Sequence, residues 1–243
     1  MSARVLVPLA GTAPGPLRID GAPFHHLRVL RVATGDRLEV FDGRGRAWDA
    51  EVLAVERDHA LVRLGAVRTA AAGRNIAIVQ ALPKADKLEL VLQKGTELGA
   101  HAFHPAVSER SLIRLSDSAA RARRERWQRI AEEAARQCGR HDVPVVHPVL
   151  PLVDAVCALA PGTRVLVLDE EEQTLRLSAA ADAEPASALA LVVGPEGGLS
   201  RSEIDALRGL GGAAVSLGPL VLRTETAALA ALAVLRHRDG LLG

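Results

Sequence analysis

The spacing of hydrophobic positions changes near residue 73, and this change divides the chain into two parts. Residues 1–70 alternate short apolar runs with turn residues, a pattern typical of a small β-barrel. A short helix over 25–31 and a turn at 34–36 interrupt the series. The strands predicted in this part are 5–7, 37–41, 47–55 and 60–64.

Residues 74–243 follow a different rhythm, in which apolar strands alternate with amphipathic helices. This pattern predicts an α/β domain with a mostly parallel sheet, joined to the first part by a linker at 70–73. Ser200 and Glu203 have the spacing of a capping box, so a helix is expected to begin there. The other predicted elements are strands at 76–82, 164–168, 189–193 and 213–217 and helices at 84–98, 119–138 and 226–236.

Two glycine-containing turns follow apolar strands near the C-terminal end, at 194–198 and 217–227. Because the carboxyl ends of parallel strands meet at one edge of a sheet, both turns are expected to border one ligand site. Gly198 lets the backbone approach a ligand closely, since glycine has no β-carbon. Either turn alone is most simply a structural bend, but two successive turns that carry Glu196, Arg223 and Glu225 favour a binding site.

Composition narrows the classes of protein that fit. The chain has 243 residues, 49% of them hydrophobic, which allows a sizeable core. No apolar stretch has the length of a membrane helix and no secretion signal is evident, so a cytoplasmic protein is expected. Cys138 and Cys157 lack CxxC spacing, and His101 and His104 lack a third ligand, so no metal is expected and both histidines are interpreted as surface or packing residues.

Motifs of several common enzyme classes are missing from the sequence. It contains no P-loop, no GxGxxG dinucleotide motif and no GxSxG nucleophile motif. ATP, NAD and serine hydrolase chemistry are therefore disfavoured.

Positive charge is concentrated in the middle of the chain. Residues 110–140 carry 9 basic and 4 acidic side chains, whereas residues 141–243 carry 7 basic and 13 acidic ones. The arginine-rich stretch fits a polyanion such as RNA, although a solvated helix face would have the same composition. Aromatic residues make up only 2% of the chain, which argues against RNA binding by base stacking.

Seven blocks, spread over nearly the whole chain, carry a resemblance to a known family. They are Arg4 with the strand that follows it, 26–31, Lys87 with 93–99, 108–111, 125–140, 193–200 and 217–227. In this order they resemble the signatures of the ribosomal small subunit methyltransferase E family. Each block alone is weak evidence for the resemblance, whereas the set together is specific for this family. Gly95 and Cys138 stand where alanine and serine are common in the family, and neither residue touches the expected chemistry.

The resemblance implies a PUA-like β-barrel for RNA over residues 1–70 and a SPOUT methyltransferase domain over 74–243, whose strand-end loops form a trefoil knot. It implies methyl transfer from S-adenosylmethionine to N3 of a specific uridine in 16S rRNA, with a homodimer as the working form. The 16S rRNA partner is expected within the small ribosomal subunit, and whether the free rRNA or the assembled subunit is the substrate stays open. The implied cofactor-binding residues are Leu168, Gly194, Gly198, Leu217 and Leu222. The expected RNA-binding residues are Arg4, Arg28 and Arg31 from the barrel and Arg110, Gln137 and Arg140 from the catalytic domain.

Arg223 and Glu196 are the expected catalytic residues. Uridine N3 is a poor nucleophile until it loses its proton. Arg223 is therefore expected to stabilise negative charge on the uracil oxygens, while Glu196, or a water that it orients, accepts the proton. A different interpretation is an ion pair between Arg223 and Glu196 or Glu225 that only braces the loops.

Two other functions fit the same sequence. A non-enzymatic RNA-binding or ribosome-assembly factor would share the barrel and the arginines. A SPOUT methyltransferase that acts on another RNA would share the fold.

Overall fold

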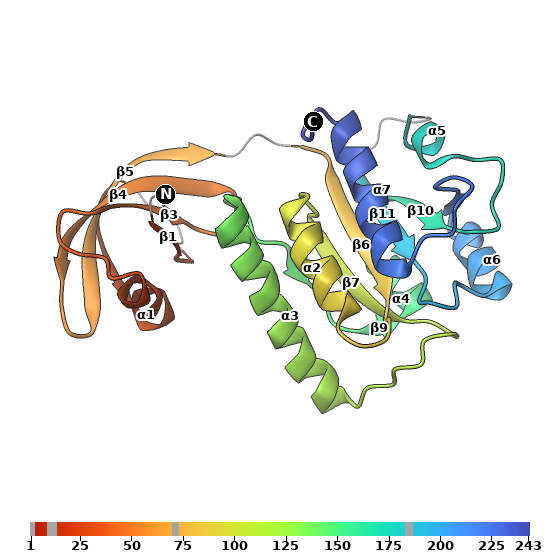
Figure 1. Cartoon of the computed structure of the whole chain (residues 1–243), viewed down its shortest axis with the longest axis horizontal. Helices are drawn as coiled ribbons and strands as arrows, with labels where there is room; N and C mark the ends of the chain where they lie inside the picture. Colours follow the sequence, from red (N-terminus) through yellow and green to blue (C-terminus); the bar gives the residue numbers. More distant parts are fainter. Residues whose placement is uncertain (1–2, 9–13, 70–72, 183–186) are drawn as a thin grey trace. The chain divides into compact units, whose positions relative to one another are not determined.

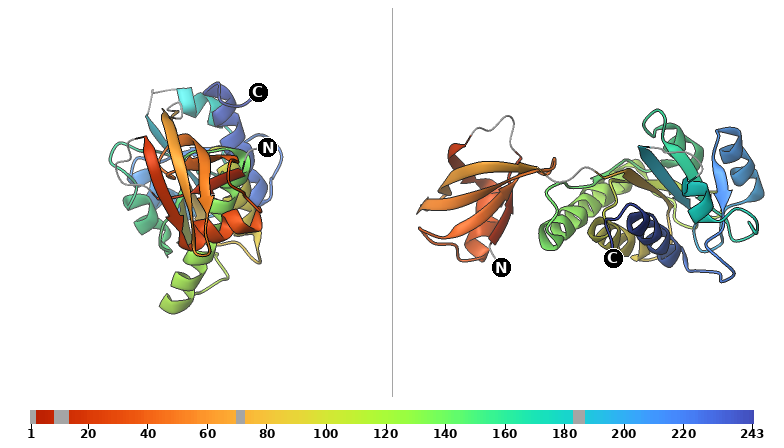
Figure 2. Two further views of the ribbon diagram at one scale, coloured as in Figure 1. Left: turned by 90° about the vertical axis from the view of Figure 1, so that its left-hand side faces the viewer. Right: turned by 90° about the horizontal axis from the view of Figure 1, so that it is seen from above.

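A computed structural model of the chain describes residues 3–8, 14–69, 73–182 and 187–243. Contacts between residues group the chain into two units, whose elements are labelled in Figure 1 and seen from two further directions in Figure 2. One unit comprises Met1–Ala72 and Ala135–Val143, and the other comprises Gly73–Ala134 and Pro144–Gly243. The first unit thus includes a segment from the middle of the sequence, which the spacing of hydrophobic positions did not predict.

The first unit is built on a five-stranded sheet with the strand order β1-β3-β4-β5-β2. All its pairings are antiparallel except that of β1 with β3, and helix α1 packs against both edge strands, β1 and β2. Along β5, Ala60, Val62 and Leu64 are buried in the core because alternate side chains of a strand share one face. The elements are β1 (Ala3–Leu6), β2 (Gly15–Asp20), α1 (Gly21–Val29), β3 (Arg37–Phe41), β4 (Arg46–Val55) and β5 (His59–Thr69).

The second unit is built on a parallel sheet with the order β12-β10-β11-β6-β7-β8, and β9 pairs with β7. The strands β6, β10 and β11 are almost continuously apolar because helices cover both faces of the sheet. The strands are β6 (Asn75–Ala81), β7 (Ala102–Val107), β8 (Val145–Val146), β9 (Leu150–Pro151), β10 (Arg164–Leu168), β11 (Ala188–Val193) and β12 (Ala213–Val215).

Helices on the two faces of this sheet enclose separate cores. Helices α2 and α7 contact each other on one face, and α4 and α6 contact each other on the opposite face (Figure 1). Within β6, Ile76 and Ile78 belong to the first core, whereas Ala77 and Val79 belong to the second. The helices are α2 (Lys87–Glu97), α3 (Asp117–Cys138), α4 (Leu152–Cys157), α5 (Leu177–Asp182), α6 (Arg201–Gly209) and α7 (Thr224–Arg238).

The predicted parallel α/β sheet is confirmed, as are the predicted bounds of β10. The predicted capping box is also present, because the Ser200 hydroxyl accepts from the Glu203 amide and the Glu203 carboxylate accepts from the Ser200 amide. The helix predicted at 25–31 lies earlier, at Gly21–Val29, and Arg31 has a positive φ of 56°. The hydrophobic pattern missed β2, β7, β8, β9, α4 and α5.

Two other expectations concern the ends of these units. The predicted linker at 70–73 lies outside the described residues except for Gly73. Within the part of the chain that the structure describes, no helix combines the length and the apolar character that crossing a bilayer requires.

Candidate active site

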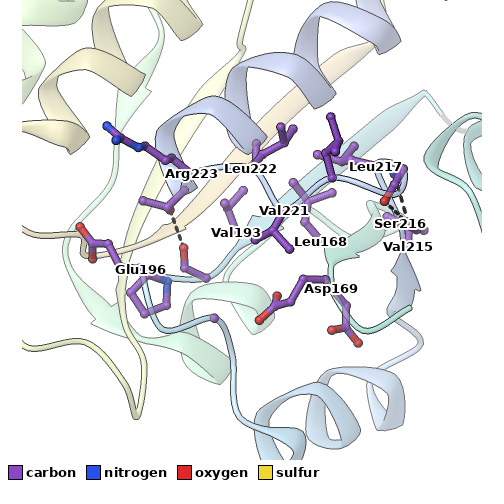
Figure 3. Close-up of a pocket in the computed structure, with 18 of the residues that line it drawn as sticks. Leu168, Asp169, Val193, Glu196, Val215, Ser216, Leu217, Val221, Leu222 and Arg223 are labelled. Atoms are coloured by element: carbon purple, nitrogen blue, oxygen red, sulfur yellow. Dashed lines mark hydrogen bonds between the residues drawn. The ribbon is translucent and has the colours of Figure 1, made fainter. Parts of the chain in front are cut away.

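A pocket of about 390 Å³ opens at the carboxyl ends of β10, β11 and β12. All five cofactor-binding residues implied by the sequence line it, together with Glu196 and Arg223. In Figure 3, Glu196 and Arg223 lie at one end of this pocket, and Asp169 and Ser216 lie at the other. The two glycine turns predicted to border one site are therefore brought together by the parallel sheet.

Two glycines allow the loop after β11 to fold tightly. A β-carbon at Gly194 would lie 2.9 Å from the carbonyl carbon of Gly198 and 3.0 Å from the amide nitrogen of Leu199, and backbone atoms cannot easily move aside. Gly198 has a φ of 68°, a left-handed conformation that other residues adopt at a cost. The sequence predicted a close approach of the backbone to a ligand at Gly198. The close contacts at Gly194 are instead between backbone segments of the same loop.

A buried polar network joins this loop to the start of α7. The Gln80 side chain, at the end of β6, donates to the Thr224 hydroxyl at 2.9 Å and to the Gly194 carbonyl at 3.3 Å. The Thr224 hydroxyl donates to the same carbonyl at 2.5 Å. Gln80 and Thr224 are buried, so these bonds fix the two loops against each other with little competition from water.

At the opposite end of the pocket, Asp169 is held by Arg201. Both Asp169 carboxylate oxygens accept hydrogen bonds from the Arg201 guanidinium at 2.8 Å. Burial alone would raise the pKa of Asp169, but the hydrogen bonds from Arg201 and from the Glu171 amide lower it below its ordinary value. The neighbouring Glu170 is exposed and lines the pocket beside Gly198. This end of the pocket therefore carries two carboxylates with different surroundings.

Lys87, the first residue of α2, connects both loops of the pocket. Its ammonium lies 2.8 Å from a Glu196 carboxylate oxygen and 3.7 Å from Glu225 Oε2. Glu196 also accepts a hydrogen bond from the Lys84 amide at 3.0 Å. Burial would raise the pKa of Glu196, but the hydrogen bonds from Lys87 and the backbone amides and the charge of Lys87 lower it. The hydrogen bond to Glu196 likewise raises the pKa of Lys87.

Arg223 precedes α7 as its N-cap residue and is exposed at the pocket. Among the described residues its guanidinium forms no ion pair or hydrogen bond, and in Figure 3 it does not meet the Glu196 carboxylate. The ion pair considered from the sequence, between Arg223 and Glu196 or Glu225, is therefore wrong for this conformation. Lys87 takes that place for both carboxylates.

The arginines expected to bind RNA have unequal surroundings. Arg28 and Arg31 are exposed in and just after α1. Arg4 is instead mostly buried, donating to Glu39 at 2.6 Å and to the carbonyls of 135, 136 and 140 at 3.2, 2.7 and 2.9 Å. These carbonyls lie at and just after the C-terminal end of α3, so Arg4 satisfies groups that a helix end leaves unpaired.

The other three expected RNA-binding residues also differ from one another. By their contacts, Gln137 and Arg140 group with the first unit, although both lie within residues 74–243, which the sequence assigned to the catalytic domain. Gln137 is exposed, whereas Arg140 pairs with Asp142. Arg110 is exposed and donates to the Gly197 carbonyl at 2.7 Å, which anchors it to the glycine loop.

The two histidines considered as metal ligands differ in their exposure to solvent. His101 is exposed, whereas His104 is buried in β7 and stacks on His147 with ring centroids 4.0 Å apart. Burial, followed by the charge of His147, lowers the pKa of His104 to about 4. The described residues contain no group of three or more acidic, histidine or cysteine side chains placed to hold a metal ion.

Sequence reasoning left Lys87, Gln80 and Thr224 off the list of site residues. A signal for the first two was present, because β6 is an apolar strand that ends near Gln80 and the next helix begins at Lys87. The carboxyl end of any parallel strand beside β11 belongs to the same edge of the sheet.

This combination of a parallel sheet, a pocket at its carboxyl edge and a small β-rich unit has clear relatives. The sequence model of the family described as "RNA methyltransferase domain" matches residues 71–236, and that of the family described as "RNA methyltransferase PUA domain" matches residues 19–65. The fold and the site are those of an RNA methyltransferase with an attached PUA domain.

Curated relatives and solved structures narrow the class further. Ribosomal RNA small subunit methyltransferase E of Bacillus subtilis is 37% identical over 232 residues, covering 92% of this chain and 91% of the relative. A ribosomal RNA small subunit methyltransferase E from Neisseria gonorrhoeae, whose crystal structure is bound to S-adenosyl methionine, is 31% identical to this chain. The two structures have a TM-score of 0.88, and the match covers 98% of both chains.

A putative methyltransferase from Legionella pneumophila, in complex with its cofactor SAM, is 30% identical with a TM-score of 0.84 and also covers 98% of both chains. The chain belongs to the ribosomal RNA small subunit methyltransferase E family, as the order of the seven sequence blocks predicted.

Proposed function

We propose that this protein transfers a methyl group from S-adenosylmethionine to N3 of a uridine in 16S rRNA. The observation that carries the proposal is the pocket at the carboxyl ends of β10, β11 and β12, in a chain of this family. The reaction takes place in the cytoplasm, on RNA of the small ribosomal subunit, with a homodimer as the working form. The loops around the pocket belong to a trefoil knot of the SPOUT type.

The residues of the pocket fit S-adenosylmethionine. A volume of about 390 Å³ lies in the range of small-molecule sites. Leu168, Leu217 and Leu222 supply apolar walls for an adenosine group, and the backbone at Gly194 and Gly198 supplies polar groups at close range. When bound, this cofactor supplies a methyl group attached to a positively charged sulfur. After transfer of the methyl group to N3, the rest of the cofactor leaves with its sulfur as a neutral thioether.

Arg223 is the residue proposed to act on the base. As the N3–H bond gives up its proton, negative charge spreads onto the uracil oxygens, and a guanidinium at hydrogen-bond distance stabilises that charge. Arg223 suits this task because it is exposed at the pocket, carries a planar guanidinium with several hydrogen-bond donors and is not paired with a described carboxylate. Holding base and methyl group in line supplies much of the remaining rate enhancement.

Glu196 is the sequence candidate for accepting the N3 proton. Its lowered pKa makes the carboxylate a weak base, and its oxygens already accept hydrogen bonds from Lys87 and Lys84. We therefore assign the proton to hydroxide from solvent and keep Glu196 with Lys87. A pH–rate profile of Glu196→Gln tests this choice, because loss of the general base would abolish the rise of rate with pH.

For RNA binding we propose Arg28, Arg31, Arg110 and Gln137, which are exposed. Arg4 and Arg140 are left out of this set because their side chains are mostly buried and pair with Glu39 and Asp142. Arg110 stays in the set because it is exposed, although it donates to the Gly197 carbonyl. The partner subunit is proposed to complete the surface.

The proposed function is tested by nucleoside mass spectrometry of rRNA. RNA from cells that lack this protein should lack one N3-methyluridine in 16S rRNA, and purified protein with S-adenosylmethionine should restore it. The Arg223→Ala variant, produced in parallel, should restore little. Failure of the purified protein to restore the modification even with S-adenosylmethionine would favour an assembly factor. A missing modification in another RNA would favour a different RNA substrate.

A further inference from the structure

Two charged side chains that line one end of the pocket, Lys87 and Glu196, and a third beside them, Glu225, come from three separate segments. Lys87 begins α2, Glu196 lies in the loop after β11, and Glu225 lies in the first turn of α7. Lys87 is the only one of the three that contacts both others, at 2.8 Å and 3.7 Å. A single ammonium thus serves one carboxylate from the loop after β11 and one from the start of α7.

Both carboxylates depend on this ammonium. Glu225 is mostly buried, and its Oε2 atom, fully enclosed, has no hydrogen-bond partner among the described residues. An enclosed carboxylate without a compensating charge is costly, so it attracts any cation within reach. Glu196 is an exposed residue whose side chain is 29% exposed, and its carboxylate accepts a hydrogen bond from Lys87.

Among the described residues that line the pocket, Arg223 is the other cation at this end. It precedes Glu225 by two positions, and like Glu196 it lines the pocket (Figure 3). With Lys87 bound to both carboxylates, neither of them pairs with Arg223. An arginine pairs with a carboxylate through two parallel hydrogen bonds, so removal of Lys87 would offer Arg223 a strong new partner.

We propose that Lys87 is a positioning residue that occupies Glu196 and Glu225 and thereby keeps the Arg223 guanidinium available to the uracil base. The inference rests on the proposed function for its catalytic consequence. Lys87 does not itself act on substrate. It prevents the ion pair that would otherwise neutralise Arg223.

The first test is a change of Lys87 in two backgrounds. In the otherwise native protein, Lys87→Met is expected to lower the single-turnover rate of rRNA methylation about 100-fold, the scale of losing one stabilising donor. In the Glu196→Gln/Glu225→Gln background there is no carboxylate left to capture Arg223. There the same change is expected to cost less than about 10-fold. Equal losses in both backgrounds would overturn the proposal, because they would mean that Lys87 acts directly.

Two variants control for charge and folding. Lys94→Met removes a lysine from the same helix that pairs with Glu97 at 2.9 Å outside the pocket, and it should leave the rate unchanged. Lys87→Arg keeps a cation beside both glutamates and should retain most of the activity. Thermal unfolding of each variant shows whether it is folded, and the Gln background avoids a buried, uncompensated Glu225.

A second test does not depend on activity. In a crystal structure of the Lys87→Met variant, the Arg223 guanidinium should lie within ion-pair distance of Glu196 or Glu225. An Arg223 that stays unpaired there would overturn the proposal even if the variant were inactive. If the native protein methylates no rRNA, the proposed function fails, and this structure still decides whether Lys87 keeps Arg223 unpaired.

Discussion

Replacement of Gly198 by alanine should destabilise the pocket mainly through the backbone. Gly198 has a φ of 68°, and an L-residue in this left-handed conformation costs about 1–2 kcal/mol. The new β-carbon would also lie 2.3 Å from Glu170 Oε1, but this atom is the end of an exposed, flexible side chain and can move. The free energy of unfolding should therefore fall by about 1–2 kcal/mol, or Tm by about 2–8 °C.

Urea unfolding of Gly198→Ala, alone and combined with Glu170→Ala, separates the two causes. If backbone strain dominates, Gly198→Ala costs the same in both backgrounds; if Glu170→Ala removes the whole cost, the reasoning is refuted. Gly209→Ala is the matched control, because Gly209 ends α6, has no positive φ and leaves a β-carbon in open space. This change should be neutral or stabilising by up to about 1 kcal/mol. Calorimetry should show weaker S-adenosylmethionine binding for the Gly198 variant only.

Two further predictions concern protons and RNA. Because the pKa of His104 falls to about 4 in the folded protein, the neutral ring stabilises the fold above pH 6.5, and about 3 kcal/mol is lost as the pH drops from 6.5 toward 4. Urea unfolding of His104→Phe should lack this part of the pH dependence, and an unchanged dependence would contradict the assignment. Arg28→Ala and Arg31→Ala should each weaken RNA binding and reduce by about 1 the slope of log binding constant against log salt concentration. Arg4→Ala should instead lower Tm. The opposite pattern would put Arg4 on the RNA surface.

The sequence was informative where local chemistry decides the structure. The apolar runs of β10 and β11 are long enough to stand out, and Ser200 with Glu203 defines a helix start through bonds between near neighbours. The two glycine turns were placed at one site because strand direction alone brings them to one edge of the sheet.

Strand β7 shows why other elements were missed. It contains His104 and Pro105, and a proline cannot donate a hydrogen bond within a sheet, so the segment does not read as a central strand. In the fold, β7 pairs on one side with β8 at 102–103 and with β9 at 106–107. The gap between these pairings falls at His104 and Pro105. A histidine followed by a proline in a buried strand is thus accommodated by long-range partners that no local pattern reveals.

Charge pairing at the pocket was the least predictable feature of the site. It depends on which of several cationic side chains the tertiary structure places beside each carboxylate. From the sequence, Arg223 is the natural partner of Glu196 and Glu225, since it lies two positions from Glu225 in the same turn. Lys87 is more than one hundred residues away and still contacts both carboxylates, because α2 begins at the same edge of the sheet. An arginine that faces a substrate is best kept apart from acidic neighbours, and in our proposal Lys87 does this for Arg223. The availability of Arg223 is therefore a property of the tertiary structure, and mutation of Lys87 is the most direct way to take it away.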